Sequence, residues 1–171
     1  MHLRRPWWKP LDAGYVKTNF DRAIFKDLQA AGIGVVIRDE HGKVIAILAE
    51  KISILELVLT LGTLEARQAV QFVQELRPRN SIFEGDYETS INVISKGDLL
   101  HSSCGHIIKD ILLTSTSLQS FFFLSHINRY GNILVDAFAK KAKFSFPLLV
   151  WMEFVPPDFY KCYLLAFSAI E

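Results

Sequence analysis

The sequence predicts an α/β fold built on a mixed five-stranded sheet, three antiparallel strands followed by two parallel ones, with helices on both faces. Three observations support this prediction. Apolar side chains alternate along residues 15–21, which is the period of strands, and two further strand-like segments follow at 31–38 and 44–54. Apolar side chains then recur at helical spacing, and in the second half short apolar runs alternate with helical segments, the order that produces parallel crossovers.

Length and composition limit the class of protein. The chain has 171 residues, 50% hydrophobic and 22% charged, with 9 Gly and 6 Pro, which excludes disordered and fibrous classes. Its net charge of +1 excludes attraction of a polyanion by the whole molecule, so any nucleic-acid affinity has to come from a local arrangement. We expect a lead segment (1–14), one domain (15–146) and an apolar tail (147–171) that packs on or extends the domain.

The N-terminus and the cysteines predict the compartment. The basic residues near the start are not followed by an apolar run of signal-peptide length, and no segment approaches the ~18 apolar residues of a membrane span. Cys104 and Cys162 have no CxxC partner, which favours ordinary thiols over a zinc site or a disulfide framework. We therefore expect an intracellular protein with no membrane partner, nuclear or cytoplasmic, and take a monomer as the default oligomeric state.

The first three strands are predicted at residues 15–21, 31–38 and 44–54. In the first of them Val16, Thr18 and Phe20 share one face, and Asp21 lies on the other, more polar face. A turn signal at residues 39–42 separates the second strand from the third. Short connections of this kind make an antiparallel meander.

An amphipathic helix follows over residues 57–77 and ends before Pro78. At about 100° per residue its apolar positions fall within one narrow sector, and Glu65 lies in the same sector. A carboxylate in an apolar stripe is costly unless it is paired or bound to a metal. Two interpretations therefore stay open: Glu65 binds a metal, or it forms a buried salt bridge with a lysine or an arginine.

The second half of the chain continues with strands at 81–86 and 121–127 and helical segments at 88–95, 105–118 and 132–143. Asn132 is the candidate cap of the last helix. A strand that follows a crossover helix runs parallel to an earlier one, so Asp86 stands at a carboxyl end, where ligands of open α/β sheets bind. Asp136 lies beside the apolar stripe of the last helix, in its first turns.

Four carboxylates thus stand out by position: Asp21, Glu65, Asp86 and Asp136. If the first and fourth strands are neighbours, all four converge at one end of the sheet. Two like charges about 5 Å apart repel by roughly 3 kcal/mol at an effective dielectric near 20, so such a cluster must take up protons or bind hard cations. Oxygen ligands suit Mg²⁺ or Mn²⁺, and a pair of these ions supports in-line displacement at phosphorus, which cuts phosphodiesters.

Five segments of the chain together resemble the type 1 ribonuclease H domain, and more closely the plant ribonuclease H-like domains that are similar to retrotransposon reverse transcriptases. The segments are VKTNFDRA (16–23), AGIGVVIRD (31–39), LEA (64–66), FEGD (83–86) and HINRYGNILVDAFAK (126–140). They occur in the family's order and with its approximate spacing, over roughly residues 15 to 143. The resemblance implies a ribonuclease H-like fold and cleavage of the RNA strand of an RNA/DNA hybrid.

The resemblance also implies the roles of individual residues. Asp21, Glu65, Asp86 and Asp136 fall on the family's metal-binding carboxylates, which hold two Mg²⁺ or Mn²⁺ ions. Asp21 and Asp86 would bind both metals, Glu65 the metal nearer the 2′-hydroxyl and Asp136 the metal on the nucleophile side. His126 falls on the family's mobile histidine and would assist proton transfer.

Three departures from the family pattern lead to a second hypothesis. Arg22 stands where the family has glycine after the first aspartate, and its side chain either obstructs the substrate backbone or points away from the carboxylates and contacts phosphate. Leu64 replaces the usual alanine, and no basic insertion follows Asp86, so hybrid affinity is expected to be weak. The second hypothesis is a ribonuclease H-like module that binds nucleic acid or a protein partner without catalysis. Arg22, the near-neutral charge and the missing insertion favour it, and the four intact carboxylates oppose it.

Each candidate site residue also has an ordinary structural explanation. Asp136 would be favourable near a helix N-terminus, Asp86 would be a turn residue and Asp21 would cap a turn. His126 would be an exposed or locally bonded histidine. The shared order with a known family favours the joint site over these separate explanations.

Overall fold

A six-stranded mixed sheet forms the centre of the protein. The computed structural model describes residues 13–53, 58–78, 80–85, 105–124, 132–144 and 148–161, and in this part of the chain the strand order is β5-β4-β1-β2-β3-β6. The strands are β1 (Tyr15–Phe25), β2 (Ala30–Arg38), β3 (Val44–Ser53), β4 (Asn80–Gly85), β5 (Ser120–Leu124) and β6 (Leu148–Met152).

The strand pairing confirms the predicted mixed sheet and adds one strand to it. β1, β2 and β3 pair antiparallel, β4 runs parallel to β1, and β5 runs parallel to β4. β6 comes from the segment that was expected to be a tail, and it pairs antiparallel with the outer edge of β3. The sheet therefore has six strands where the sequence predicted five.

The turn predicted at residues 39–42 connects β2 to β3, and the side chain of Asp39 stabilises it. Oδ1 of Asp39 accepts hydrogen bonds from the backbone N–H groups of His41 and Lys43, both at 2.9 Å. Gly42 adopts a φ of 81°, which glycine adopts without the steric cost of a side chain. The pairing of the two strands that the turn connects shifts register between Ile37 and Arg38.

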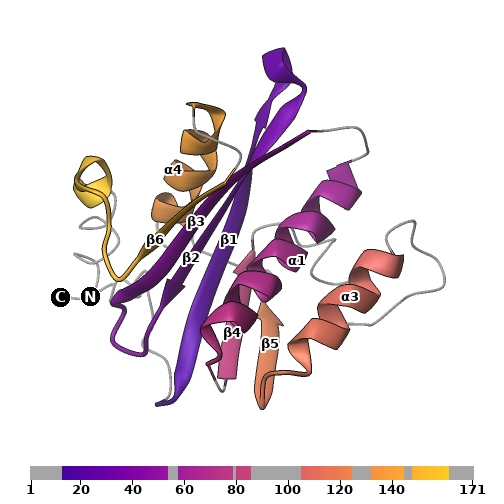
Figure 1. Ribbon diagram of the computed structural model, residues 1–171, viewed down its shortest axis with the longest axis vertical. Coiled ribbons are helices and arrows are strands. Elements are labelled where there is room, and N and C mark those ends of the chain that lie inside the picture. The colour runs from indigo at the N-terminus through magenta and orange to yellow at the C-terminus, as the bar shows by residue number, and fades with distance from the viewer. Residues whose placement is uncertain are drawn as a thin grey trace, which may run out of the picture.

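Helices cover both faces of the sheet. α1 (Val58–Leu76) and α3 (Gly105–Ser115) pack side by side on one face, and α4 (Ile133–Lys141) lies on the other (Figure 1). Three 3₁₀ turns complete the described elements: η1 (Lys26–Leu28), η2 (Ala142–Phe144) and η3 (Pro157–Phe159). The helical segment predicted at 88–95 lies outside the described residues. None of the described helices combines the length and the apolar character that crossing a membrane requires.

Each face of the sheet has its own apolar core. Beneath α1 and α3, Phe20 and Val35 of the sheet pack with Ala66, Val70 and Ile108 of the helices, all of them fully or almost fully buried. This is the face that the alternation along the first strand predicted to be apolar. On the other face, α4 contributes apolar side chains that pack on β2 and β3.

Two glycines let α4 lie directly on the backbone of β2. A Cβ on Gly32 would overlap the carbonyl oxygen of Ala139, and a Cβ on Gly34 would overlap the carbonyl oxygen of Val135. Gly34 is also the register partner of Asp21 on β1. The close approach of α4 to Gly34 therefore brings the beginning of that helix beside Asp21.

Candidate functional site

Asp21 lies on the central strand β1, one residue beyond the position where β4 ends, and is held on both oxygens. Its side chain is buried on β1, with Oδ1 accepting a hydrogen bond from the backbone N–H of Arg22 at 2.8 Å. Oδ2 accepts a hydrogen bond from Nδ2 of Asn132 at 3.0 Å. Because the second donor comes from a residue 111 positions away, this contact joins β1 to the beginning of α4. The carboxylate therefore has one fixed orientation.

The beginning of α4 supplies the next carboxylate. Asn132 occupies the N-cap position as predicted, but its side chain makes no capping hydrogen bond and is directed to Asp21 instead. Its backbone oxygen accepts the hydrogen bond of the Asp136 N–H at 3.0 Å. Asp136 lies in the first turn, half-buried, and its Oδ2 forms an ion pair of 2.9 Å with Nζ of Lys140, which is 67% exposed.

The third carboxylate, Glu65, belongs to α1, which covers the face of the sheet opposite to α4 (Figure 1). Its side chain is completely buried, and its Oε1 lies 3.4 Å from Nη1 of Arg22, whose side chain is 15% exposed. The predicted position of Glu65 on the core side of the helix is confirmed by its burial, and the salt bridge considered for it is present. The alternative that Arg22 points away from the carboxylates is wrong, because its guanidinium is directed to Glu65.

Contacts thus connect three carboxylates from three elements at one end of the sheet. The connection runs through Glu65, Arg22, Asp21 and Asn132 and reaches Asp136 through the helix backbone. The fourth predicted carboxylate, Asp86, and the predicted histidine, His126, lie outside the described residues.

β4 pairs with the edge of β1 that faces away from β2, and it ends beside Asp21. It ends at Gly85, the register partner of Phe20, which directly precedes Asp21 in sequence. A Cβ on Gly85 would lie 2.5 Å from a ring carbon of Phe20, so only glycine fits this position without a shift. The packing of Phe20 thus explains why glycine ends the strand.

A divalent ion would meet different surroundings at the two ends of this site. Among the described residues, no three carboxylate, histidine or cysteine side chains lie close enough together to hold a metal ion. Asp21 offers oxygen ligands, and Oδ1 of the buried Asn132 has no hydrogen-bond partner in the described part of the chain. Glu65 already faces the cation of Arg22 through its Oε1, while its Oε2 is buried without a hydrogen-bond partner in the described residues, as Oδ1 of Asn132 is.

A buried polar cluster beside Asp21 was not predicted. Glu84 on β4 forms an ion pair of 3.0 Å with Nζ of Lys17 and accepts a hydrogen bond of 3.1 Å from Nδ2 of Asn19. Lys17, Asn19 and Asp21 lie on the same face of β1, as the alternation predicted, but they are buried rather than solvated. Their burial depends on the neighbouring elements, for which the sequence of β1 carries no signal.

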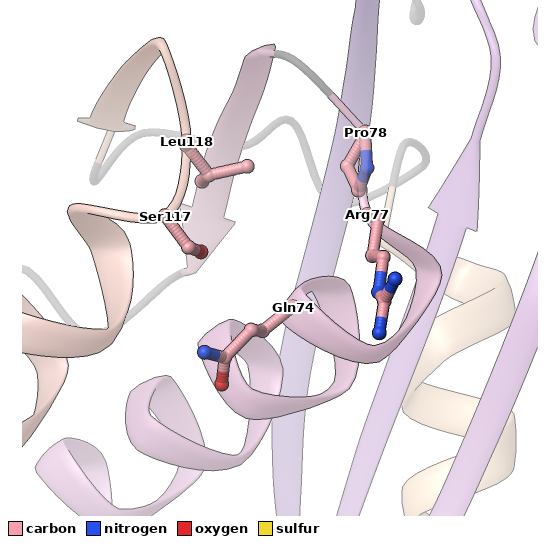
Figure 2. Close-up of a pocket in the computed structure, with 5 residues that line it drawn as sticks. All are labelled: Gln74, Arg77, Pro78, Ser117 and Leu118. Atoms are coloured by element: carbon pink, nitrogen blue, oxygen red, sulfur yellow. The ribbon is translucent and has the colours of Figure 1, made fainter.

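The cavity that the structure contains at the end of α1 is separate from this site. It has a volume of about 280 Å³ and is lined by Gln74, Arg77, Pro78, Ser117 and Leu118 (Figure 2). Pro78 precedes β4 and Leu118 precedes β5, so the cavity lies where these parallel strands begin. Gly85, near Asp21, lies where β4 ends. The cavity is therefore at the opposite end of the sheet.

Sequence comparison identifies one family. The model of a family described as reverse transcriptase-like matches residues 19–142, which contain all five candidate site residues. No curated protein matches the chain.

Structural comparison identifies the fold. Ribonuclease H1 from the halophilic archaeon Halobacterium salinarum has a TM-score of 0.67 at 17% identity, over 77% of this chain and 98% of that chain. LC11 ribonuclease H1, isolated from compost and solved with an RNA/DNA hybrid, has a TM-score of 0.64 at 17% identity, over 74% and 95%. Foamy viral protease-reverse transcriptase in complex with an RNA/DNA hybrid has a TM-score of 0.59 at 11% identity, over 77% and 20%. Identities this low establish the fold alone, which is ribonuclease H-like.

Proposed function

The chain belongs to the reverse transcriptase-like family, and from that premise we propose that it is a metal-dependent endonuclease that hydrolyses the RNA strand of RNA/DNA hybrids. One observation carries the proposal. Asp21 is fixed at the point where β1 meets the beginning of α4, with Glu65 of α1 connected to it through Arg22. Carboxylate oxygens from separate elements can together bind a divalent cation, because Mg²⁺ and Ca²⁺ prefer oxygen ligands.

Mg²⁺ or Mn²⁺ is the proposed cofactor. Asp21 and Asp136 are the proposed ligands among the described residues, joined by Asp86, while His126 is proposed to assist proton transfer. A divalent ion on such oxygens lowers the pKa of a bound water and stabilises charge on a leaving oxygen. The resemblance implies a second ion at Glu65, and the ion pair of Glu65 with Arg22 opposes it.

The residues around Asp21 have a positioning role in this proposal. Asn132 and the backbone of Arg22 each donate to a different oxygen of the Asp21 carboxylate, so its orientation does not depend on a bound ion. A carboxylate oxygen can accept more than one contact, so these hydrogen bonds do not by themselves prevent a cation from binding. The site is therefore preorganised at the Asp21 end.

A second candidate function is a nucleic-acid-binding or protein-binding module without catalysis. The specific observation in its favour is that two of the three described carboxylates face cations of the protein itself. Glu65 faces Arg22, and Asp136 faces Lys140. The resemblance to plant, retrotransposon-related domains is compatible with either function.

Cleavage of a labelled hybrid separates the two candidates. We expect the wild-type protein to cut the RNA strand of a fluorescent RNA/DNA duplex with Mg²⁺ or Mn²⁺ and to leave it intact with EDTA. Asp21→Asn should lose this cleavage while keeping the far-UV circular dichroism of the wild type. Asp158→Asn, the same change at an exposed position of η3, is the matched control and should keep full activity. Cleavage by Asp21→Asn at the wild-type rate would reject the proposal, and binding of the hybrid without any cleavage would favour the module.

A further inference from the structure

We propose that the guanidinium of Arg22 is a built-in cation that takes the place of one divalent ion at Glu65, so that the site binds a single divalent ion at its Asp21 end. This inference rests on the proposed function, because it concerns the same carboxylates. It assigns Glu65 to a partner within the chain and leaves the ion to Asp21 and its neighbours.

The burial of Glu65 is the first step of the argument. Its side chain is completely inaccessible to solvent, on a helix packed against the sheet. A buried carboxylate requires a compensating cation or hydrogen-bond donors. Arg22 provides the cation at 3.4 Å, and its own side chain is largely buried there. The charge of Glu65 is thus balanced before any ion binds.

The geometry of β1 is the second step. Asp21 and Arg22 are consecutive, so their side chains leave the strand on opposite faces, with Arg22 on the face of Phe20 and α1. The Arg22 side chain consequently stands between the strand that carries Asp21 and the helix that carries Glu65. An ion that bound Glu65 would have to displace the guanidinium or lie beside its positive charge.

The Asp21 end of the site differs from the Glu65 end in the exposure of its ion pair. Asp136, 40% exposed, faces Lys140, which is 67% exposed and a single helical turn away, and pairs this accessible to water open at little cost. Asn132 is buried, and its Oδ1 has no partner among the described residues. Asp21, Asp136 and Oδ1 of Asn132 are therefore the ligands that we assign to the single ion.

Counting bound Mn²⁺ tests the inference without reference to catalysis. Titration calorimetry of the wild type, Arg22→Lys, Arg22→Gln and Arg22→Gly gives the stoichiometry and the affinity of each, and Lys109→Ala, an exposed lysine of α3, is the control for lost charge. We expect one ion per chain for the wild type, Arg22→Lys and Lys109→Ala. We expect a second ion for Arg22→Gly and Arg22→Gln, or an affinity increased by about tenfold, the lower end of what groups around a metal ligand contribute.

Glu65→Gln is a second test that does not require removal of the arginine. Because Glu65 is not a ligand in this scheme, the variant should bind the single ion with an affinity within about twofold of the wild type. An affinity lowered by about tenfold or more would make Glu65 a ligand and overturn the inference. Two ions on the wild type, or no ion on any variant, would overturn it equally.

The outcomes for the inference and for the proposed function are distinguishable. A wild type that binds two Mn²⁺ ions and cuts hybrids retains the proposed function and refutes the role of Arg22. A wild type that binds one Mn²⁺, loses it in Asp21→Asn and cuts no hybrid supports the role of Arg22 and refutes the nuclease.

Discussion

Replacing Arg22 by alanine removes the cation that lies 3.4 Å from the buried carboxylate of Glu65. At this distance two unit charges attract by roughly 5 kcal/mol at an effective dielectric near 20. Breaking a buried pair at one partner costs about 3–5 kcal/mol, and the partial exposure of Arg22 lets water reach the carboxylate and reduces that cost. We expect Arg22→Ala to lower the free energy of unfolding by about 2–4 kcal/mol, or Tm by about 5–12 °C.

Urea unfolding followed by circular dichroism measures this change. Lys109→Ala is the matched control, because it removes an exposed cation from α3 and should change stability by less than about 0.5 kcal/mol. The double variant Arg22→Met with Glu65→Leu removes both charges and should recover most of the loss. If Arg22→Ala unfolds at the same urea concentration as Lys109→Ala, the ion pair does not stabilise the buried carboxylate and the reasoning is refuted.

Three further predictions concern the surroundings of the site. Gly34→Ala should lower stability by about 1–3 kcal/mol in urea unfolding, because its methyl group overlaps the backbone of α4; an unchanged midpoint would contradict the close contact. Lys17→Met leaves Glu84 buried without its cation and should cost about 2–4 kcal/mol in the same assay, and equal stability would show that the pair contributes nothing. Burial raises the pKa of the Glu50 carboxyl in the folded protein above its usual 4.5, against the smaller opposing effect of Arg67. The free energy of unfolding of the wild type therefore falls as the pH rises from the usual pKa through the raised pKa of the folded protein. Glu50→Gln should therefore be more stable than the wild type at about pH 7 and equal to it at about pH 3, and a difference independent of pH would contradict this.

The main elements could be predicted because their signals are local. Period-two alternation located residues 15–21 of β1, which continues to Phe25, and it separated the face of Phe20 from the face of Asp21 correctly. Helical spacing located α1 and placed Glu65 on its buried side. These two results together imply that Arg22 faces α1, because it follows Asp21 directly in the strand.

The remaining features depend on contacts between distant segments. β6 forms because β3 has a free edge, and nothing within residues 148–152 identifies that partner. Lys17 and Glu84 are buried together only because β4 lies beside β1. Gly32 and Gly34 did carry a signal, since glycines within a strand often mark the close approach of another backbone.

The position of a bound ion is the most direct test of the account. Paramagnetic broadening by substoichiometric Mn²⁺, recorded on backbone amides of the full chain, reports which residues surround the ion. The account predicts that the amides of Arg22, Gly34 and Asn132 broaden first, that those of Ser117 and Leu118 at the opposite end of the sheet broaden least, and that EDTA reverses the effect. Strongest broadening at Ser117 and Leu118, or equal broadening throughout the chain, would contradict a divalent-ion site at Asp21.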